Sequence, residues 1–202
     1  MKWWEKTVEY FFIQKFVPMD AILSPLDGKH ELAGDTFLGN HENWIIIEFK
    51  VDHLAVKSEE KKFKDYSSAF IELSSRDSHH FIIYGAVNQG EFGLRGRTYF
   101  SAEPVNNVEK VLTSGIPKEE FVEYLKILTK QKATSSGQSG VSTGSYSFVA
   151  GINKNKEITR CMNLYEFGLD HGLTLEPKLS ATQKLAAKRE RERGMDFGGP
   201  SF

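Results

Sequence analysis

The sequence predicts a single α/β domain, and three observations lead to that prediction. Apolar residues recur at helical spacing in several segments, apolar strand-like runs stand between those segments, and 202 residues is the length of one domain. Hydrophobic residues make up 40% of the chain and aromatic residues 12%, which is enough to fill a core. We place the domain at residues 1–179, with its core over residues 1–90, and expect a polar helix and a disordered tail over 180–202.

Composition restricts the classes of function. The formal net charge is −1, so any contact with nucleic acid has to come from a local basic patch. Cys161 is the single cysteine, which excludes an internal disulfide and a cysteine zinc site. The apolar runs are much shorter than a membrane span, and the early Glu5 is atypical of a signal peptide. We therefore expect a cytoplasmic protein without membrane contact.

The end of one apolar run carries the clearest chemical signal. Three consecutive isoleucines favour a strand, and they are followed by Glu48, Phe49 and Lys50. Strand side chains alternate between faces, so Glu48 and Lys50 point one way and Phe49 points the other. A buried carboxylate and ammonium are costly unless they are paired or used, which makes this strand end a candidate site.

A second carboxylate precedes this strand. Asp35 lies upstream, and a hairpin of residues 31–38 and 43–54 would bring it beside Glu48. Two carboxylates and the lysine at one point would form a divalent-metal site suited to hydrolysing phosphodiesters.

The pattern of Asp35, twelve intervening residues and Glu48-X-Lys50 resembles the PD-(D/E)XK nuclease superfamily, whose fold is restriction-endonuclease-like. Gly34 stands where the family often has proline. The resemblance implies an αβββαβ core with a mixed sheet flanked by helices. It also implies that Mg²⁺ or Mn²⁺ is held by Asp35, Glu48 and the backbone carbonyl of Phe49. Lys50 would orient or help to deprotonate the attacking water, or neutralise charge in the transition state.

Residues 3–16 predict an amphipathic helix with Val8 on its apolar face. Glu5 projects onto that face and Glu9 lies at its border. One interpretation is that both glutamates are solvated. The other follows from the resemblance, because the first helix of the superfamily often offers a glutamate to the metal site. Glu5 is then the first candidate catalytic glutamate and Glu9 the second.

Residues 57–74 predict a second helix, with Glu59 in a first turn that favours acids. Several lysines crowd its N-terminal half. They are interpreted either as an ordinary solvated face or as contacts to a phosphate backbone near the metal strand. On the second interpretation Lys61 and Lys64 bind nucleic acid.

Residues 79–87 predict another buried strand, so the order of elements over residues 1–90 agrees with the core that the resemblance implies. Residues 91–102 predict an extra strand with a basic tip at Arg95 and Arg97. Arginine suits phosphate recognition, which makes both residues candidate nucleic-acid contacts; a plain surface hairpin is the alternative.

The C-terminal half predicts further elements and one loop. Residues 117–131 predict a structural helix, 133–147 a flexible Ser/Gly loop and 146–169 a hairpin. Residues 180–193 predict a polar helix, interpreted as solvated, partner-binding or nucleic-acid-binding. The tail over 180–202 is therefore a candidate contact to a partner protein.

We expect a metal-dependent nuclease acting on nucleic acid, with DNA as the first substrate to test. Two alternatives remain: a non-catalytic module on the same fold that binds nucleic acid or a partner, and a plain α/β protein in which Glu48 and Lys50 form a strand-end salt bridge. A homodimer would suit an enzyme that cuts both strands of a duplex.

Overall fold

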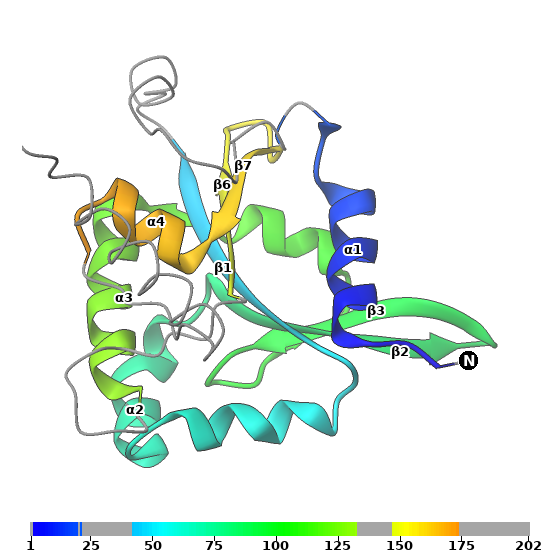
Figure 1. The fold of residues 1–202 in the computed structure, drawn as a ribbon, viewed down its shortest axis with the longest axis horizontal. Helices are drawn as coiled ribbons and strands as arrows, with labels where there is room; N and C mark the ends of the chain where they lie inside the picture. The colour runs from blue at the N-terminus through cyan, green and yellow to red at the C-terminus, as the bar shows by residue number, and fades with distance from the viewer. Residues whose placement is uncertain (1, 20, 22–41, 133–146, 174–202) are drawn as a thin grey trace, which may run out of the picture.

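The computed structural model describes residues 2–19, 21, 42–132 and 147–173 (Figure 1). Within these residues the chain forms a mixed, open, seven-stranded sheet flanked by helices. The predicted α/β class, with a mixed sheet between helices, is confirmed at this level. None of the helices in these ranges combines the length and the apolar character that a membrane span requires.

The described chain contains α-helices, 3₁₀ helices and strands. The α-helices are α1 (Glu5–Phe16), α2 (Tyr66–Leu73), α3 (Lys118–Gln131) and α4 (Leu164–Asp170). The 3₁₀ helices are η2 (Ala55–Lys62), η3 (Ser74–Arg76) and η4 (Val108–Thr113). The strands are β1 (Asn43–Lys50), β2 (His80–Asn88), β3 (Glu91–Thr98), β4 (Pro104–Val105), β5 (Ile116–Pro117), β6 (Phe148–Ile152) and β7 (Ile158–Asn163).

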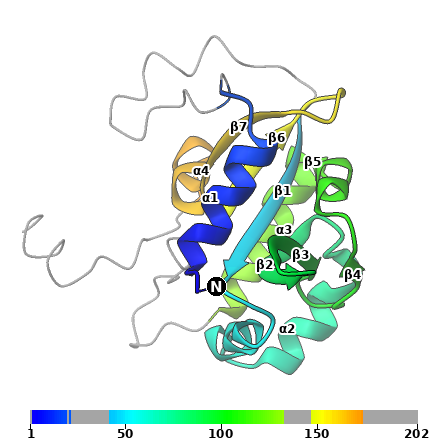
Figure 2. The same cartoon turned by 90° about the vertical axis from the view of Figure 1, so that its right-hand side faces the viewer.

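Strand β1 lies near the middle of the sheet. The strand order is β4-β3-β2-β1-β6-β7, and β5 pairs with the first residues of β1. Strands β1 and β2 run parallel, and the chain crosses between them through η2 and α2. The other described strand pairs are antiparallel. Figure 2 shows the chain leaving the end of β1 and turning into the crossover, whose η2 lies beside Glu48 and Lys50.

The two faces of β1 pack against different helices, as the alternation of its side chains requires. Ile45, Ile47 and Phe49 join the core under α1 and η4. Trp44 and Ile46 join the core under α2, α3 and α4. Glu48 and Lys50 follow on this second face, so the predicted alternation around Phe49 is confirmed.

The helix predicted over residues 57–74 is divided in the structure. The 3₁₀ helix η2 ends at Lys62, and α2 begins only after a new N-cap at Asp65, whose carboxylate accepts hydrogen bonds from the amides of Ser67 and Ser68. Phe63 lies in the break, where it is buried and forms a bridge with Lys132 of the chain beyond α3. Tertiary contacts therefore override the helical periodicity of this segment.

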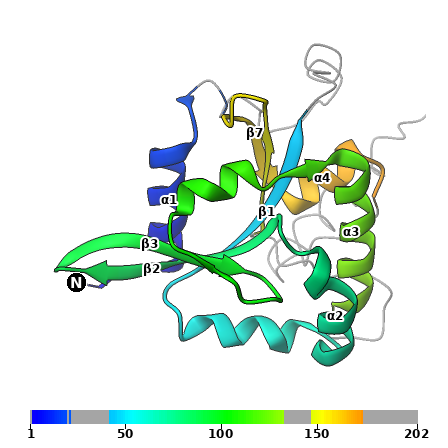
Figure 3. The ribbon, with the colours of Figure 1, turned by 180° about the vertical axis from the view of Figure 1, so that it is seen from behind.

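The extra strand predicted over residues 91–102 is present as β3, which forms a hairpin with β2, but its basic residues are not at the tip. The tight turn is formed by Gln89 and Gly90, both with positive φ, which suits the twist of a two-residue hairpin. Arg95 and Arg97 lie within β3 instead, opposite Tyr84 and Ile82 of β2. Figure 3 shows this hairpin extending away from α3.

The hairpin predicted over residues 146–169 has a shorter second strand in the structure than the sequence predicts. Strand β7 ends at Asn163, where α4 begins. The side chain of Asn163 accepts from the amide of Glu166, and the carboxylate of Glu166 accepts from the amide of Asn163. This reciprocal pair starts a helix and stops the strand. The segments 31–38 and 180–193, and most of the loop 133–147, lie outside the described residues.

Candidate functional site

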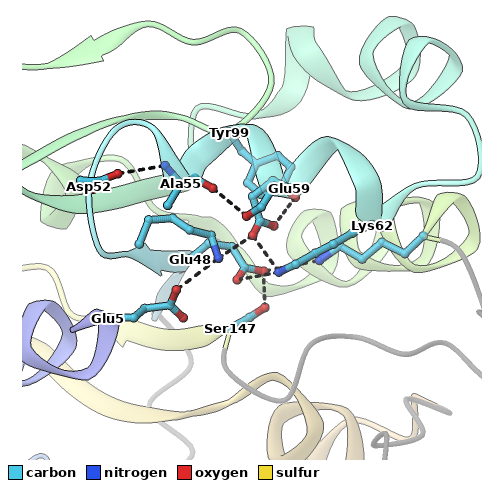
Figure 4. A network of polar contacts seen from close by, with 11 residues as sticks. Glu5, Glu48, Asp52, Ala55, Glu59, Lys62, Tyr99 and Ser147 are labelled. Atoms are coloured by element: carbon cyan, nitrogen blue, oxygen red, sulfur yellow. Dashed lines mark hydrogen bonds and ion pairs between the residues drawn. The ribbon is translucent and has the colours of Figure 1, made fainter.

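A cluster of charged side chains lies where β1 ends, on the face covered by η2 and α3 (Figure 4). Glu48 and Lys50 are buried there, 2% and 6% exposed. Helix α1 brings Glu5 to the same place, and η2 brings Glu59 and Lys62. We call this group, completed by Lys132, Ser147 and Tyr99, the β1-end cluster.

Glu48 is held from three directions. Ser147 Oγ donates to its Oε1 at 2.5 Å, and Lys132 Nζ lies 3.4 Å from the same oxygen. Its Oε2 has a looser contact, with Lys62 Nζ at 3.7 Å. Burial alone would raise the pKa of Glu48, but Lys132, Lys62, the Ser147 hydroxyl and Lys50 together lower it to about 2. Glu48 is therefore ionised at neutral pH.

Lys50 lies between two carboxylates. Its Nζ is 2.7 Å from Glu59 Oε1 and 3.5 Å from Glu5 Oε2. Glu59 is as buried as Glu48, whereas the side chain of Glu5 is 44% exposed. The contact with Glu59 is thus both the closer and the more shielded of the two, and Glu5 marks the side on which the cluster meets solvent.

Glu59 is itself fixed by several partners. The hydroxyl of Tyr99 donates to its Oε2 at 2.7 Å. Lys62 Nζ lies 2.8 Å from its Oε1, the oxygen that also contacts Lys50. The two lysine contacts of Oε1 are ion pairs, and this oxygen accepts no hydrogen bond from the described residues. Burial and the neighbouring Glu59 carboxylate raise the pKa of Tyr99 well above its ordinary value, so its phenol remains a donor.

The charges of the cluster balance. Glu5, Glu48 and Glu59 face Lys50, Lys62 and Lys132. Burial alone would lower the pKa of Lys62, but Glu48 and Glu59 outweigh it and raise that pKa, so Lys62 is a cation. Balanced pairing is the condition under which charges survive in an interior, because each isolated charge would cost several kcal/mol.

The metal predicted for this site was tested against the donors in the described residues. They contain no group of three or more His, Cys, Asp or Glu side chains placed to hold a metal ion. The donor chemistry nevertheless suits Mg²⁺ or Mn²⁺, which prefer carboxylate oxygens. Glu48 Oε2 is the oxygen with the more distant partner, Lys62, whose side chain is 32% exposed. The site therefore fits a hard cation in part, with Asp35 outside the described residues.

The structure brings three predicted residues together and leaves others apart. Glu5, Glu48 and Lys50 meet in the cluster. Glu9 instead forms an ion pair with Lys6 on the same helix at 2.6 Å, so Glu5 is the glutamate that α1 presents to Lys50. The ring of Phe49 packs on the opposite face, and its carbonyl belongs to the same strand end.

The predicted nucleic-acid contacts occupy surfaces around the cluster. Lys61 and Lys64 are exposed, and the lysine of that run which enters the cluster is Lys62. Arg95 is exposed and Arg97 half-buried. Both arginines lie opposite β2 residues that in turn pair with Lys50 and Glu48.

Five members of the cluster were missed by the sequence analysis. They are Glu59, Lys62, Tyr99, Lys132 and Ser147. Glu59 was interpreted as a helix-dipole acid; its spacing of three residues from Lys62, on a helix, was the one available signal. The others come from distant segments, and nothing local marks them.

Comparison with models of protein families, with curated proteins and with solved structures finds no match for this chain.

Proposed function

We propose that this protein is a metal-dependent nuclease that hydrolyses phosphodiester bonds of nucleic acid, with DNA as the first substrate to test. One observation carries the proposal. Glu5, from α1, and Glu48 and Lys50, from β1, meet at one strand end although 42 residues separate Glu5 from β1's Glu48 along the chain. An ionised carboxylate beside a lysine at this point is what the sequence pattern requires of a metal-assisted hydrolase.

Three groups would hold Mg²⁺ or Mn²⁺: the Glu48 carboxylate, the backbone carbonyl of Phe49 and the Asp35 carboxylate. When bound, the metal would polarise the scissile phosphate and lower the pKa of a water molecule. Glu48 is suited to this role because its carboxylate is already ionised and one oxygen, Oε1, is anchored by Ser147. The anchored carboxylate cannot rotate freely, which fixes where Oε2 points.

Lys50 would act beside the reacting phosphate. Its ammonium is held between Glu59 and Glu5, so a positive charge lies at a fixed place at the solvent side of the cluster. A positioned cation stabilises negative charge that develops in the transition state, and it can orient a water molecule for attack. Glu5 would complete this side through water.

The arginines of β3 are the proposed contacts to the substrate backbone, with Arg95 exposed and the buried Ile82 between Arg97 and Glu48. Cross-strand partners share a face, so Glu48, Ile82 and Arg97 form one row across the sheet. Two strand spacings separate Glu48 from Arg97, which places their Cα atoms about 10 Å apart. Arg95 occupies the same position in the next row, beyond Tyr84 and Lys50. We assign phosphate contacts to these arginines and to the exposed Lys61 and Lys64.

A restriction-endonuclease-like core is part of the same proposal. A helix precedes β1, and a helical crossover leads from β1 to the parallel strand β2. This order supports such a core. Both edges of β1 are occupied along its first residues, by β6 on one side and by β5 and then β2 on the other. The sheet therefore offers the predicted hairpin of residues 31–38 and 43–54 no free edge of β1 there, and Asp35 would have to reach the site by another route.

The test uses the full chain with plasmid DNA, linear DNA and RNA, each with Mg²⁺ or Mn²⁺ and with a chelator. Metal-dependent cleavage is expected, with more than about 100-fold loss in Asp35→Ala and Glu48→Gln, because metal contacts supply several kcal/mol. Glu9→Gln is the matched control, since Glu9 pairs with Lys6 outside the cluster. Absence of cleavage of every substrate, or cleavage unchanged in both variants, would refute the proposal.

One observation favours a second candidate, a non-catalytic module that binds nucleic acid or a partner. The acids and lysines of the cluster already neutralise each other, and Glu48 is 2% exposed. On this alternative the cluster stabilises the fold and the basic residues around it provide the binding surface. Titration calorimetry separates the two: Mg²⁺ or Mn²⁺ binding that is lost in Glu48→Gln supports the enzyme, and nucleic-acid binding without metal binding supports the module.

A further inference from the structure

We propose that Glu59, fixed by Tyr99, is a positioning residue that holds the Lys50 ammonium at the reacting end of β1. The inference rests on the proposed nuclease function, but it concerns a contact that can be measured without catalysis. Neither residue belongs to the Asp-Glu-X-Lys pattern. Both reach the site from other parts of the chain, η2 and the residue after β3.

Lys50 has two carboxylate partners, and they restrain it unequally. Glu5 lies 3.5 Å from Lys50 Nζ and is 44% exposed, so water weakens that contact. Glu59 lies at 2.7 Å and is 2% exposed. A close ion pair in a shielded place restrains a flexible lysine far more than a long and solvated one. Lys50 is therefore held chiefly by Glu59.

Glu59 is held by a hydrogen bond from Tyr99. Its two oxygens have separate duties: Oε2 accepts from the Tyr99 hydroxyl at 2.7 Å, and Oε1 faces Lys50 and Lys62. Without the tyrosine, the carboxylate could rotate about its terminal bond and exchange these oxygens. The phenol thus sets the plane of the carboxylate and with it the place of Lys50.

Tyr99 is positioned by its contacts with His80. Its ring stacks on His80 with centroids 3.9 Å apart and an angle of 18°. Its amide donates to the carbonyl of His80 at 2.8 Å, and His80 shares a hydrogen bond with the hydroxyl of Tyr124. Tyr99 and Tyr124 are each 1% exposed. The support runs from a helix α3 residue through the sheet to Glu59, on packed elements rather than on a free loop.

This arrangement separates two functions of the lysines. Lys62 and Lys132 form ion pairs with Glu48, whereas the ion pairs of Lys50 among the described residues are with Glu59 and Glu5. The Lys50 ammonium is thus paired with Glu59 and Glu5 rather than with Glu48, its neighbour in the sequence pattern. Removing Glu59 would free Lys50 to pair with Glu48 and to leave the place where substrate charge develops.

The experiment compares Glu59→Gln and Tyr99→Phe with Glu60→Gln in the full chain. Glutamine keeps the size of Glu59 and removes its charge, phenylalanine keeps the ring that stacks on His80 and removes the hydroxyl, and Glu60 is an exposed neighbour outside the cluster. Thermal unfolding first identifies which variants fold. Tyr99→Phe serves as the test should Glu59→Gln fail to fold.

The direct readout is the NMR signal of the Lys50 side-chain ammonium, assigned by its absence in Lys50→Met. A displaced signal is expected in Glu59→Gln and a smaller displacement in Tyr99→Phe, with none in Glu60→Gln. In metal-dependent cleavage, kcat is expected to fall roughly 10- to 100-fold in Glu59→Gln with KM little changed, as for groups that orient a catalytic residue.

The outcomes keep the two proposals distinct. An unchanged Lys50 signal in both folded variants overturns the positioning role, whatever the activity. A displaced signal with unchanged kcat also overturns it. If the wild-type chain cleaves nothing, the nuclease proposal fails, and with it the catalytic use of the contact, while the NMR result still decides whether Glu59 holds Lys50.

Discussion

The two faces of β1 are equally buried and chemically opposite at the same end of the strand. On one face, Ile45, Ile47 and Phe49 continue an apolar core up to the end of the strand. On the other, Trp44 and Ile46 are followed by Glu48 and Lys50, which are 2% and 6% exposed. The first face is stabilised simply by removal from water, and the second only because other segments supply matching charges.

This difference teaches where a function is expected. An apolar side chain stabilises the fold without a specific partner, so Phe49 needs no further explanation. A buried carboxylate needs several, and Glu48 has Ser147, Lys132 and Lys62. Three other segments of the chain converge to keep one charge inside, although an apolar residue would have required none of their polar groups. Buried charges of this kind, in places where an apolar residue would suffice, are expected mainly at functional sites.

The largest expected effect is on stability, when the Glu48 charge is removed alone rather than together with its partner Lys132. Glu48→Ala should lower the free energy of unfolding by about 3–5 kcal/mol, because Lys132, with a side chain 0% exposed, would remain buried beside no partner carboxylate. Glu48→Ala combined with Lys132→Met should recover part of that loss. Chemical denaturation measures both. A double variant no more stable than Glu48→Ala would show that pairing does not maintain the ionic face.

The next effect separates the cluster from the neighbouring histidines by pH. Burial, with a contribution from Arg76, lowers the pKa of His79 from 6.5 to about 4, and burial lowers the pKa of His80 well below 6.5. The unfolded chain therefore takes up protons first, and stability should fall as pH drops from 6.5 toward 4, by about 3 kcal/mol from His79. His79→Phe should reduce this step.

Glu48 should titrate in a later window. Its pKa is lowered to about 2 from an ordinary 4.5, so its stabilisation is complete above pH 4.5 and is lost as pH falls toward 2. Unfolding curves from pH 7 to pH 2 should show the histidine step in the wild type and the later carboxylate step in both the wild type and His79→Phe. A His79→Phe variant with an unchanged upper step would contradict the assignment to His79.

A smaller effect is expected on the apolar face. Phe49→Leu keeps an apolar side chain and should cost about 1 kcal/mol of stability, with cleavage within about twofold of the wild type. Glu48→Gln, one residue away and nearly the same size as glutamate, should remove cleavage. Unfolding and single-turnover cleavage of both variants test the contrast. Equal losses of activity in the two would mean that the strand end acts as one packed unit.

The smallest effect on stability is expected for the exposed lysines. Lys61→Gln and Lys64→Gln should change the free energy of unfolding by less than about 0.5 kcal/mol. Each should weaken nucleic-acid binding and reduce the slope of log affinity against log salt by about 1, because each removes one phosphate contact. Lys15→Gln, an exposed lysine on α1, is the control. Affinities measured at several salt concentrations that do not distinguish the three variants would exclude a specific phosphate path.

Local sequence was sufficient where periodicity and packing agree. Val8 and Phe12 lie on the buried face of α1, and Phe121 lies on that of α3, as their helical spacing predicts. The strands β1 and β2 follow from their apolar runs, and the alternation at Glu48 and Lys50 follows from strand geometry. These features depend on the backbone period alone.

Contacts between distant segments decided the rest. The break after Lys62 and the inward turn of Glu59 depend on Lys50 and Tyr99, which no local pattern near η2 reveals. Asn163 ends β7 because its side chain pairs with Glu166.

By itself the sequence determined an α/β chain and one strand whose end holds Glu48 and Lys50 on the same face. Only the tertiary structure decided that Glu5 rather than Glu9 meets Lys50. It also decided that Lys62 and Lys132 pair with Glu48 and that Ser147 donates a hydrogen bond to it. The physical reason is that the two kinds of feature depend on interactions over different distances along the chain. Side-chain alternation is fixed over two residues, whereas a buried charge is stabilised by whichever groups the whole fold brings within a few ångströms.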